Sequence, residues 1–495
     1  ILQQFKEKFG YKLVCENVYS FKSFLDVFSK ICGNLGSATQ KEITQSTLVM
    51  TFGGALSYDM PVITHSINNA MKQNKGANLA SFHTMEDVVL KNFVKTAING
   101  IYKPDSEEAM ALLLASACIA KEKMPQSLKE QIEKYEKMES KTLTKEISKT
   151  IQQEALDENG NVILDEKGEP TFIKKEVSQK VDEEVEVLTS ELYGYCGESI
   201  REAIESLKEA LKGAKNPTLI VGFDVYEARN ASNIAKILGY IEALSEVKVM
   251  LLPPQTNALG VALICDLDKE SLGYSIGYNV KGKYSIGTQA DNALLMPYLN
   301  EQEGTLVNVD KRVVPIAPAT PYYGYELNDI ARALGLENEN TIDYTQELPI
   351  SKGFKSIAYD DLGFGYANDG TEIRGYLLDV NCCKKQEEIS PVTLESLGDY
   401  NLYARNSVAH FSKNTLMALH LDSKNGLQLS QDYANKLALA QGDKVEIDFL
   451  NGVIISSVVS IDKGMQGDFA ALGVCGIEDG FQNARYANAS IKALK

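Results

Sequence analysis

Thiol and imidazole side chains are the first candidates for metal or redox chemistry in this chain. The eight cysteines form no Cys-x-x-Cys pair, and the four histidines lie far apart in the sequence. Zinc and iron–sulfur sites need several such ligands at short spacings. Cys382 and Cys383 are adjacent, but they would bind a metal only with distant partners, so we expect them to be two residues at a strand end. The sequence predicts no metal site, and scattered cysteines are typical of reduced thiols in a cytosolic compartment.

Two glycine turns are the candidates for ligand binding. Gly53 and Gly54 follow the apolar run 48–52, and Gly222 follows the apolar run 219–221. Because ligands of open α/β sheets bind outside the carboxyl ends of the strands, a site should lie where these turns face each other. Glycine at a strand end also serves positive φ or close packing. Asp224 and Glu227 follow the second turn, which disfavours a phosphate-bearing ligand there.

A helix is predicted after each glycine turn. The first begins with Pro61 in its first turn, and the second is capped by Asn230 or Ser232. Apolar residues recur at helical spacing in both, namely Val62, Ile63, Ile67, Ala70 and Met71 in the first and Ile234, Ile237, Leu238, Ile241 and Leu244 in the second. Further helices over 2–9, 20–31, 85–98 and 110–120 and a strand over 77–82 complete an α/β plan with two lobes.

Charged residues dominate the segment from Lys121 to about Glu191. Turns at 157–160 and 165–168 flank short β-branched runs and predict a hairpin. A calcium loop starting at Asp157 is rejected, because its sixth and twelfth positions are Val162 and Gly168. With few apolar residues for a core of its own, this insertion is expected to be peripheral and mobile.

Composition limits the possible partners. The net charge of −17 argues against nucleic acid and against an anionic membrane surface, since both need clustered Lys and Arg. The longest apolar run, 111–120, is about half the length of a membrane span. These features predict no nucleic-acid partner and no direct membrane insertion.

The most specific motif lies in the segment from Leu299 to Val313, with Glu303-Gly304-Thr305, Asn308 and Arg312. It resembles the Glu-x-x-Gly-Thr-Phe-x-Asn-x-Glu-Gly-Arg signature of the molybdopterin oxidoreductase family, and 290–297 resembles the strand before it. The segments 402–412, which includes His410, and 427–445 resemble the family's final domain, a six-stranded barrel of double-psi type. We expect Arg312 to be a structural anchor and the barrel to dock on the lobes.

The resemblance implies four regions. They are a first α/β lobe (1–120), the charged insertion with helices and a hairpin (121–200), a second α/β lobe with a return segment (201–395) and the β-barrel (396–495). The two lobes can be interleaved in sequence.

Within that family, segments 2–10, 254–261 and 406–415 look most like the molybdopterin-oxidoreductase-like subunit of bacterial NADH-quinone oxidoreductase, respiratory complex I, of the epsilonproteobacterial type. This resemblance implies a non-catalytic scaffold at the cytoplasmic face of the inner membrane, with the other subunits of complex I as partners. Iron–sulfur clusters are then expected only upstream of Ile1, and no catalytic residue, metal or cofactor in this chain.

Two alternatives remain open. A working molybdopterin enzyme of formate dehydrogenase type would use Gly53, Gly222, Asp224 and Asn257 to line the pterin pocket, with a metal ligand that this chain does not supply. A Rossmann-type nucleotide oxidoreductase is the weaker alternative, because neither glycine turn is Gly-x-Gly-x-x-Gly.

Overall fold

The computed structural model describes the chain except for residues 93–96, 155–157, 159–161, 163–165, 198, 271–274, 281, 289–293, 337–347, 369, 381, 407–425, 466, 474–480, 482–484 and 495. The chain forms two compact units. One comprises Ile1–Ile132 and Leu192–Lys495, and the other comprises Glu133–Glu191.

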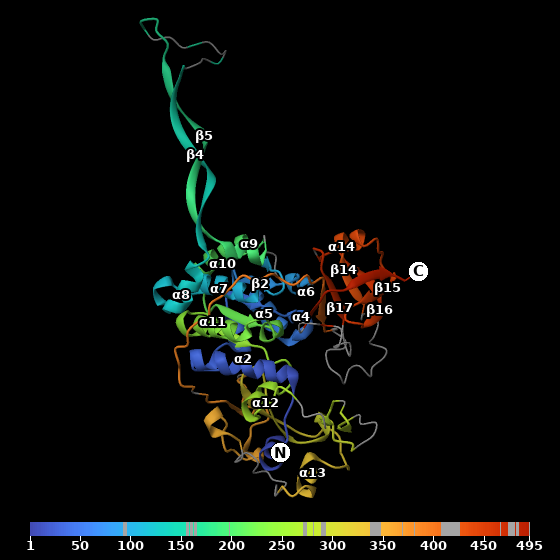
Figure 1. Cartoon of the computed structure of the whole chain (residues 1–495). Coiled ribbons are helices and arrows are strands. Elements are labelled where there is room, and N and C mark those ends of the chain that lie inside the picture. The colour runs from blue at the N-terminus through green and yellow to red at the C-terminus, as the bar shows by residue number, and fades with distance from the viewer. Residues whose placement is uncertain are drawn as a thin grey trace. The chain divides into compact units, whose positions relative to one another are not determined.

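A five-stranded parallel sheet forms the centre of the larger unit (Figure 1). Its strand order is β3 (Ala97–Ile101), β2 (Asn78–His83), β1 (Leu48–Phe52), β6 (Thr218–Val221) and β7 (Lys248–Leu251). β1 and β6 are buried along their whole length, as expected for strands covered on both faces. The two strand–glycine–helix segments therefore lie in one sheet as neighbours, and their turns meet at the point where the strand order reverses.

Amphipathic helices cover the sheet. α5 (Pro61–Gln73) starts with proline at its first position and buries Ile63, Ile67 and Ala70. α11 (Ala231–Leu244) packs against α2 (Glu16–Cys32) and α7 (Glu107–Cys118) and buries Ile234, Ile237, Leu238 and Ile241. Asn230 holds the cap position of α11 with φ of 62° but makes no side-chain cap bond. The larger unit also contains the helices α3 (Gln40–Gln45), α4 (Leu56–Asp59) and α10 (Ile200–Lys212).

Two local predictions were wrong. The helix over 85–98 is instead the short α6 (Val88–Lys91) and strand β3, because β3 finds a parallel partner in β2 that a local periodicity cannot reveal. Val62 was expected to face inward but is 58 % exposed, since the apolar stripe of α5 centres on Ile63 and Ile67.

A smaller region follows the sheet in sequence. It contains α12 (Ala258–Ile264), the strand pair β8 (Ile276–Tyr278) and β9 (Tyr284–Ile286), and α13 (Leu327–Ala333). An antiparallel sheet of β10 (Gly304–Val307), β11 (Arg312–Ile316) and β12 (Tyr376–Leu377) carries the signature segment. The N-terminal helix α1 (Leu2–Phe9) packs here, with Phe5 against Ala331 and Leu336.

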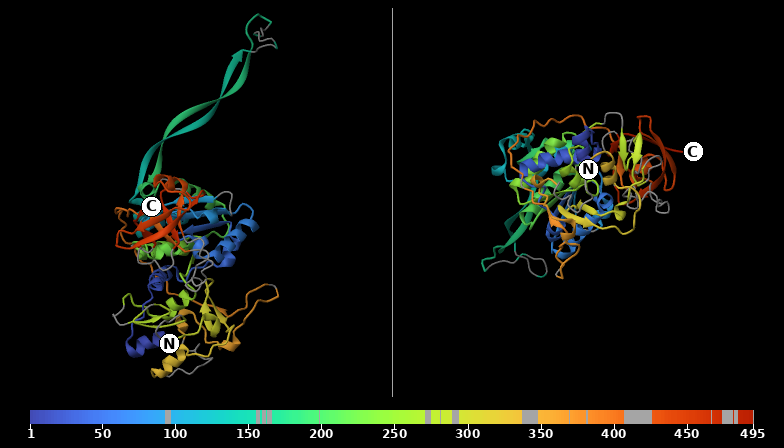
Figure 2. Two further views of the ribbon diagram at one scale, coloured as in Figure 1. Left: turned by 90° about the vertical axis from the view of Figure 1, so that its right-hand side faces the viewer. Right: turned by 90° about the horizontal axis from the view of Figure 1, so that it is seen from below.

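The carboxyl-terminal region is a curled sheet, red in Figure 2. Its described strands run in the order β18 (Tyr486–Ala487), β13 (Leu402–Arg405), β17 (Ala470–Gly473), β14 (Leu427–Ser430), β16 (Ile454–Asp462), β15 (Lys444–Asp448) and β19 (Ser490–Ala493). The parallel pairs β13–β17 and β14–β16 are joined by antiparallel pairs, around a core that includes Leu427, Val445 and Phe449. α14 (Gln431–Lys436) is capped by Ser430. The α/β class with a carboxyl-terminal barrel is thus confirmed, and a turn at Asn451-Gly452 joins β15 to β16.

The second unit is an antiparallel ribbon of two strands, β4 (Glu136–Glu154) and β5 (Phe172–Ser190), paired along their full length. Half of the predicted turn residues at 157–160 and 165–168 lie outside the described residues, namely 157, 159, 160 and 165. The ribbon unit, Glu133–Glu191, is shorter than the predicted insertion of 121–200. α8 (Gln126–Glu133) and α9 (Glu191–Cys196) lie largely in the larger unit, where Leu128 and Cys196 are fully buried.

Candidate functional site

The glycine turns after β1 and β6 approach each other very closely. Gly222 N–H donates to the Phe52 carbonyl at 2.9 Å. A Cβ on Gly222 would lie 1.9 Å from the Gly53 oxygen, and Gly53 and Gly54 have φ of 68° and 84°. Only glycine meets these requirements, so the contact between the two strand ends is sufficient to explain the glycines.

Asp224 lies just beyond this contact, in the 3-10 turn Phe223–Tyr226, and its side chain is fully buried. Its Oδ2 accepts hydrogen bonds from Gly54 N–H at 2.8 Å, Tyr403 O–H at 3.0 Å and His83 Nε2 at 3.0 Å. Because an ionised carboxylate only accepts, His83 Nε2 must carry the proton. Asp224 therefore joins three elements that are distant in sequence.

Arg485 provides the positive charge of the site. Its guanidinium donates to both carboxylate oxygens of Asp59, at 2.7 and 2.8 Å, and to Asp224 Oδ1 at 3.1 Å. It also lies 4.8 Å from the centre of the Tyr403 ring. Asn406 donates to Asp59 at 3.0 Å. We call Asp59, His83, Asp224, Tyr403 and Arg485 the ion cluster.

The electrostatics of the ion cluster follow from burial and pairing. Burial alone would raise the pKa of Asp224, but the Arg485 guanidinium and the hydrogen bond from His83 hold that pKa well below its usual range. Burial raises the pKa of Tyr403 well above its usual range, against the lowering effect of Arg485. Asp224 is therefore an anion and Tyr403 a neutral donor at neutral pH.

The barrel contributes two of the five residues of the ion cluster. Tyr403 and Arg485 belong to the β-barrel region, whereas Asp59 ends α4, His83 ends β2 and Asp224 lies in the 3-10 turn after β6. These bonds, together with the packing of Tyr403 and Tyr486 against Ala55 and Met85, confirm that the barrel docks on the carboxyl edge of the sheet.

A second buried group lies near the end of β3. Glu107, at the start of α7, is 2 % exposed, and burial raises its pKa to about 8, with Asp105 and Asp224 adding to the effect. Among the described residues, Glu107 Oε1 has no hydrogen-bond partner. A protonated Glu107 is expected at neutral pH, and buried polar atoms of this kind usually bind internal water.

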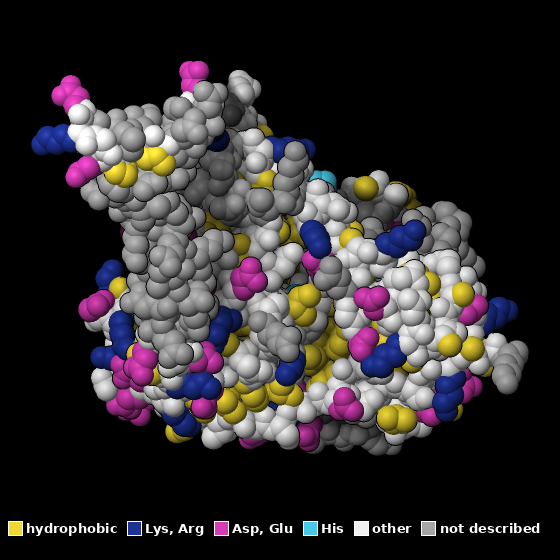
Figure 3. Space-filling view, turned by 90° about the horizontal axis from the view of Figure 1, so that it is seen from above, with side chains coloured by type: hydrophobic (Ala, Val, Ile, Leu, Met, Phe, Trp, Pro, Cys, Tyr) yellow, Lys and Arg dark blue, Asp and Glu magenta, His cyan; other side chains and the backbone are white. Residues whose placement is uncertain are grey.

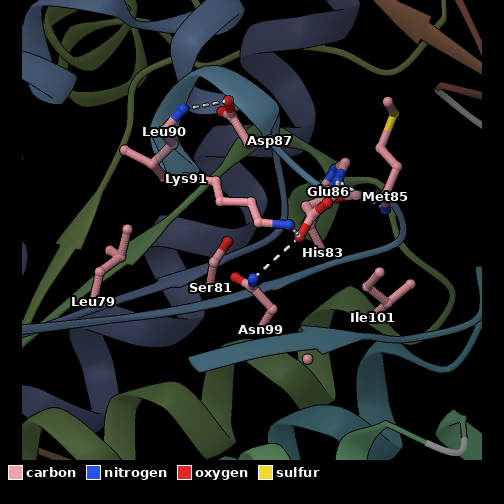
Figure 4. Close-up of a pocket in the computed structure, with 11 residues that line it drawn as sticks. Leu79, Ser81, His83, Met85, Glu86, Asp87, Leu90, Lys91, Asn99 and Ile101 are labelled. Atoms are coloured by element: carbon pink, nitrogen blue, oxygen red, sulfur yellow. Dashed lines mark hydrogen bonds and ion pairs between the residues drawn. The ribbon is translucent and has the colours of Figure 1, made fainter. Parts of the chain in front are cut away.

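A small hollow lies beside His83 (Figure 4). In it, Lys91 Nζ and Asn99 Nδ2 both donate to Glu86 Oε1, at 2.6 and 3.1 Å. The space holds about one water molecule, so it cannot accommodate a nucleotide or a pterin. A second hollow of the same size lies beside Arg229, which pairs with Asp105 and Glu395.

The structure brings three of the four predicted pocket residues together. Gly53, Gly222 and Asp224 meet at the sheet edge. Asn257 instead holds the cap position of α12 with φ of 62° and makes no side-chain cap bond; its Oδ1 accepts the Val307 N–H at 2.9 Å. Arg312 donates to the Glu372 carbonyl at 2.6 Å, as expected of a structural anchor. Cys383 is exposed, and His410 lies outside the described residues.

Sequence reasoning missed the cation of the ion cluster. His83 directly follows the predicted strand over 77–82, and Asp59 lies two residues before Pro61, so their positions could have suggested a role. Arg485 is more than 260 residues from Asp224, and no local pattern marks it.

Other classes of site find no support in the described part of the chain. No three His, Cys, Asp or Glu side chains are arranged there to hold a metal ion. None of the described helices is long and apolar enough to cross a membrane. On the face shown in Figure 3, cationic and anionic side chains are interspersed, with no continuous basic patch for nucleic acid among the described residues.

This parallel sheet with a barrel docked at its carboxyl edge is the fold of the molybdopterin oxidoreductases. Acetylene hydratase from Pelobacter acetylenicus is a solved structure of similar form, with a TM-score of 0.55 over 97% of this chain and 82% of that chain. The two sequences are 9% identical, so the similarity shows the fold alone. No family model and no curated protein matches the sequence.

Proposed function

We propose that this chain is a non-catalytic scaffold in the peripheral arm of respiratory complex I, as part of the molybdopterin-oxidoreductase-like subunit of NADH-quinone oxidoreductase. Its fold is that of a molybdopterin enzyme, and the ion cluster supports a loss of the cofactor. The motif around Glu303, Asn308 and Arg312 and the segments 2–10 and 254–261 carry the resemblance to that subunit.

The ion cluster is the observation that carries this proposal. A backbone N–H at a glycine turn is the group that receives a phosphate oxygen, but Gly54 N–H donates to Asp224 Oδ2. Arg485 could neutralise a phosphate, yet all its described ion pairs are with Asp59 and Asp224. A pterin dinucleotide would have to displace Arg485 and Tyr403 and bring its phosphates against two buried carboxylates. The residues at this edge do not fit the cofactor.

A catalytic molybdopterin-dependent oxidoreductase of formate dehydrogenase type is the second candidate. It is favoured by the fold and by the meeting of both glycine turns where the strand order reverses. Under this alternative Gly53, Gly222 and Asp224 line a pterin pocket, and the barrel moves to admit the cofactor.

Metal and pterin analysis of the native assembly separates the two candidates. The full-length protein is purified under mild detergent, and molybdenum, tungsten and pterin are measured per copy of this chain. We expect none of the three at stoichiometric level. Stoichiometric molybdenum or tungsten together with pterin would overturn the scaffold proposal.

Co-purification tests the assembly. A tagged native chain should be recovered from the cytoplasmic face of the inner membrane with the other subunits of complex I and with quinone reductase activity. A chain recovered without those subunits would refute the assignment to complex I, whatever its metal content.

A further inference from the structure

Exposed apolar side chains are concentrated in one part of the molecule. Of the 26 large apolar side chains that are exposed in the described part of the chain, 13 lie between residues 276 and 377, about a fifth of the sequence. Single exposed apolar residues need no explanation, but contiguous ones mark interaction surfaces. A candidate interaction surface in this region therefore requires exposed apolar side chains on neighbouring segments.

Two segments of this region that carry exposed apolar side chains lie side by side. Tyr322 Oη donates to the Leu295 carbonyl at 2.8 Å and lies 3.2 Å from the Tyr325 carbonyl. The N–H groups of residues 319 and 320 both donate to the Asn300 carbonyl. These bonds place segment 294–303 beside segment 319–326. We call the exposed side chains that result the tyrosine patch: Leu295 (57 %), Leu299 (52 %), Tyr323 (93 %) and Tyr325 (61 %).

The charged residues within the two segments of the tyrosine patch have one sign. Segments 294–303 and 319–326 contain Glu301, Glu303 and Glu326 and no Lys or Arg. Glu301 and Glu326 are close enough to Tyr322 to raise the pKa of its hydroxyl, after the larger effect of burial. The patch is thus apolar and aromatic at its centre and acidic at its rim.

We propose that the tyrosine patch docks a protein partner that presents Arg or Lys among apolar side chains. Tyrosine and arginine are the residues that most often dominate binding at the centre of an interface. A guanidinium packs on the face of a tyrosine ring and pairs with a neighbouring carboxylate. Each large aromatic side chain buries roughly 150–250 Å², so the two tyrosines and two leucines can form the centre of an interface of about 800 Å² per partner.

The acidic rim argues against the other occupants. A second copy of the chain docked through the same patch would place Glu301, Glu303 and Glu326 against themselves. Anionic lipid headgroups and nucleic acid would be repelled by the same carboxylates. This inference stands on the patch itself and does not depend on the proposed role in complex I.

Site-specific photocrosslinking in the native cell tests the proposal. The full chain carries p-benzoylphenylalanine at position 323, and a matched control carries it at position 450, where Leu450 in the barrel is 61 % exposed. We expect the label at 323, but not at 450, to crosslink a surface segment of another protein with net positive charge and apolar residues. A crosslink to a second copy of this chain, to an acidic segment, to lipid or to nothing would overturn the proposal.

Binding of the crosslinked partner then measures the role of the tyrosines. Tyr323→Ser combined with Tyr325→Ser should weaken the affinity at least tenfold, and Glu326→Lys should weaken it and reduce its salt dependence. Tyr284→Ser, at a 59 % exposed tyrosine outside the patch, is the matched control and should leave the affinity unchanged. Equal affinities for all variants would show that the contact lies elsewhere and would refute the proposal.

Discussion

Replacing Arg485 by methionine should destabilise the larger unit more than any other loss of a single charge in it. Methionine fills a similar volume, but the change leaves the carboxylates of Asp59 and Asp224 without their cation. These side chains are 1 % and 0 % exposed, so water cannot replace the guanidinium without opening the interface between barrel and sheet. Removal of one partner from a buried ion pair typically costs about 3–5 kcal/mol, and we expect a loss in that range.

Denaturant unfolding of the full chain, followed by both tyrosine fluorescence and circular dichroism, measures this loss. Lys436→Met is the matched control, because Lys436 pairs with Asp468 at an exposed site and its removal should give no measurable change. Combining Arg485→Met with Asp59→Asn and Asp224→Asn should recover part of the stability, since the uncompensated charges are then gone. The barrel should be the first region to lose hydrogen-exchange protection in the single variant.

The rank order of these variants decides whether charge holds the barrel in place. If Arg485→Met unfolds at the same denaturant concentration as Lys436→Met, other groups stabilise the charges of Asp59 and Asp224. The docking of the barrel then does not depend on the ion pairs of Arg485. If the triple variant is less stable than the single one, hydrogen bonding rather than charge dominates the site.

Three further outcomes are expected. Burial raises the pKa of Glu107 from 4.5 to about 8, so its contribution to the free energy of unfolding is complete below pH 4.5 and is lost as the pH rises toward 8. In urea titrations, Glu107→Gln should therefore unfold at a higher urea concentration than the wild type at about pH 9 and at the same concentration at about pH 5. Burial raises the pKa of the Cys32 thiol to about 12, so among the described cysteines thiol reagents in mass-spectrometric mapping should label Cys383 first and Cys32 only after unfolding; early labelling of Cys32 would contradict its burial. Limited proteolysis should cut the chain first within 133–191, and equal resistance of this unit and the larger one would contradict the expected peripheral role.

The sequence predicted the helices and strands that are specified by local sequence patterns. α5 is marked by Pro61 and its apolar stripe, and β6 by a continuous apolar run followed by Gly222. The prediction of a helix over 85–98 was wrong because strand β3 is short and becomes a strand only through its pairing with β2. The order of the strands, and hence the junction of the two lobes in one sheet, also lies beyond any local pattern.

The position of the candidate site could be predicted from the sequence, but most of the residues that form it could not. The glycine turns located it at the carboxyl edge of the sheet, and Asp224 was recognised as an obstacle to a phosphate. Arg485 reaches the same point from the far end of the chain, and Tyr403 arrives with the barrel. The sequence suggested that Asp224 is an unpaired charge near a ligand. In the structure Asp224 is instead paired with Arg485 and Tyr403, which local sequence patterns could not predict.

The glycines themselves do not discriminate between scaffold and enzyme. Gly222 is required by the 1.9 Å separation that a Cβ would have from the Gly53 oxygen, and this requirement holds with or without a ligand. The discriminating feature is the recipient of the Gly54 N–H. A cofactor phosphate and the Asp224 carboxylate are both anions that compete for that one donor, and here the carboxylate is covalently part of the chain and is paired with Arg485 from the barrel. Removal of Asp224 alone would free the amide but would leave Arg485 bound to Asp59, so a phosphate that used both groups would require changes on both sides of the interface. The same coupling ties the docked barrel to the carboxyl edge of the sheet through Asp59 and Asp224.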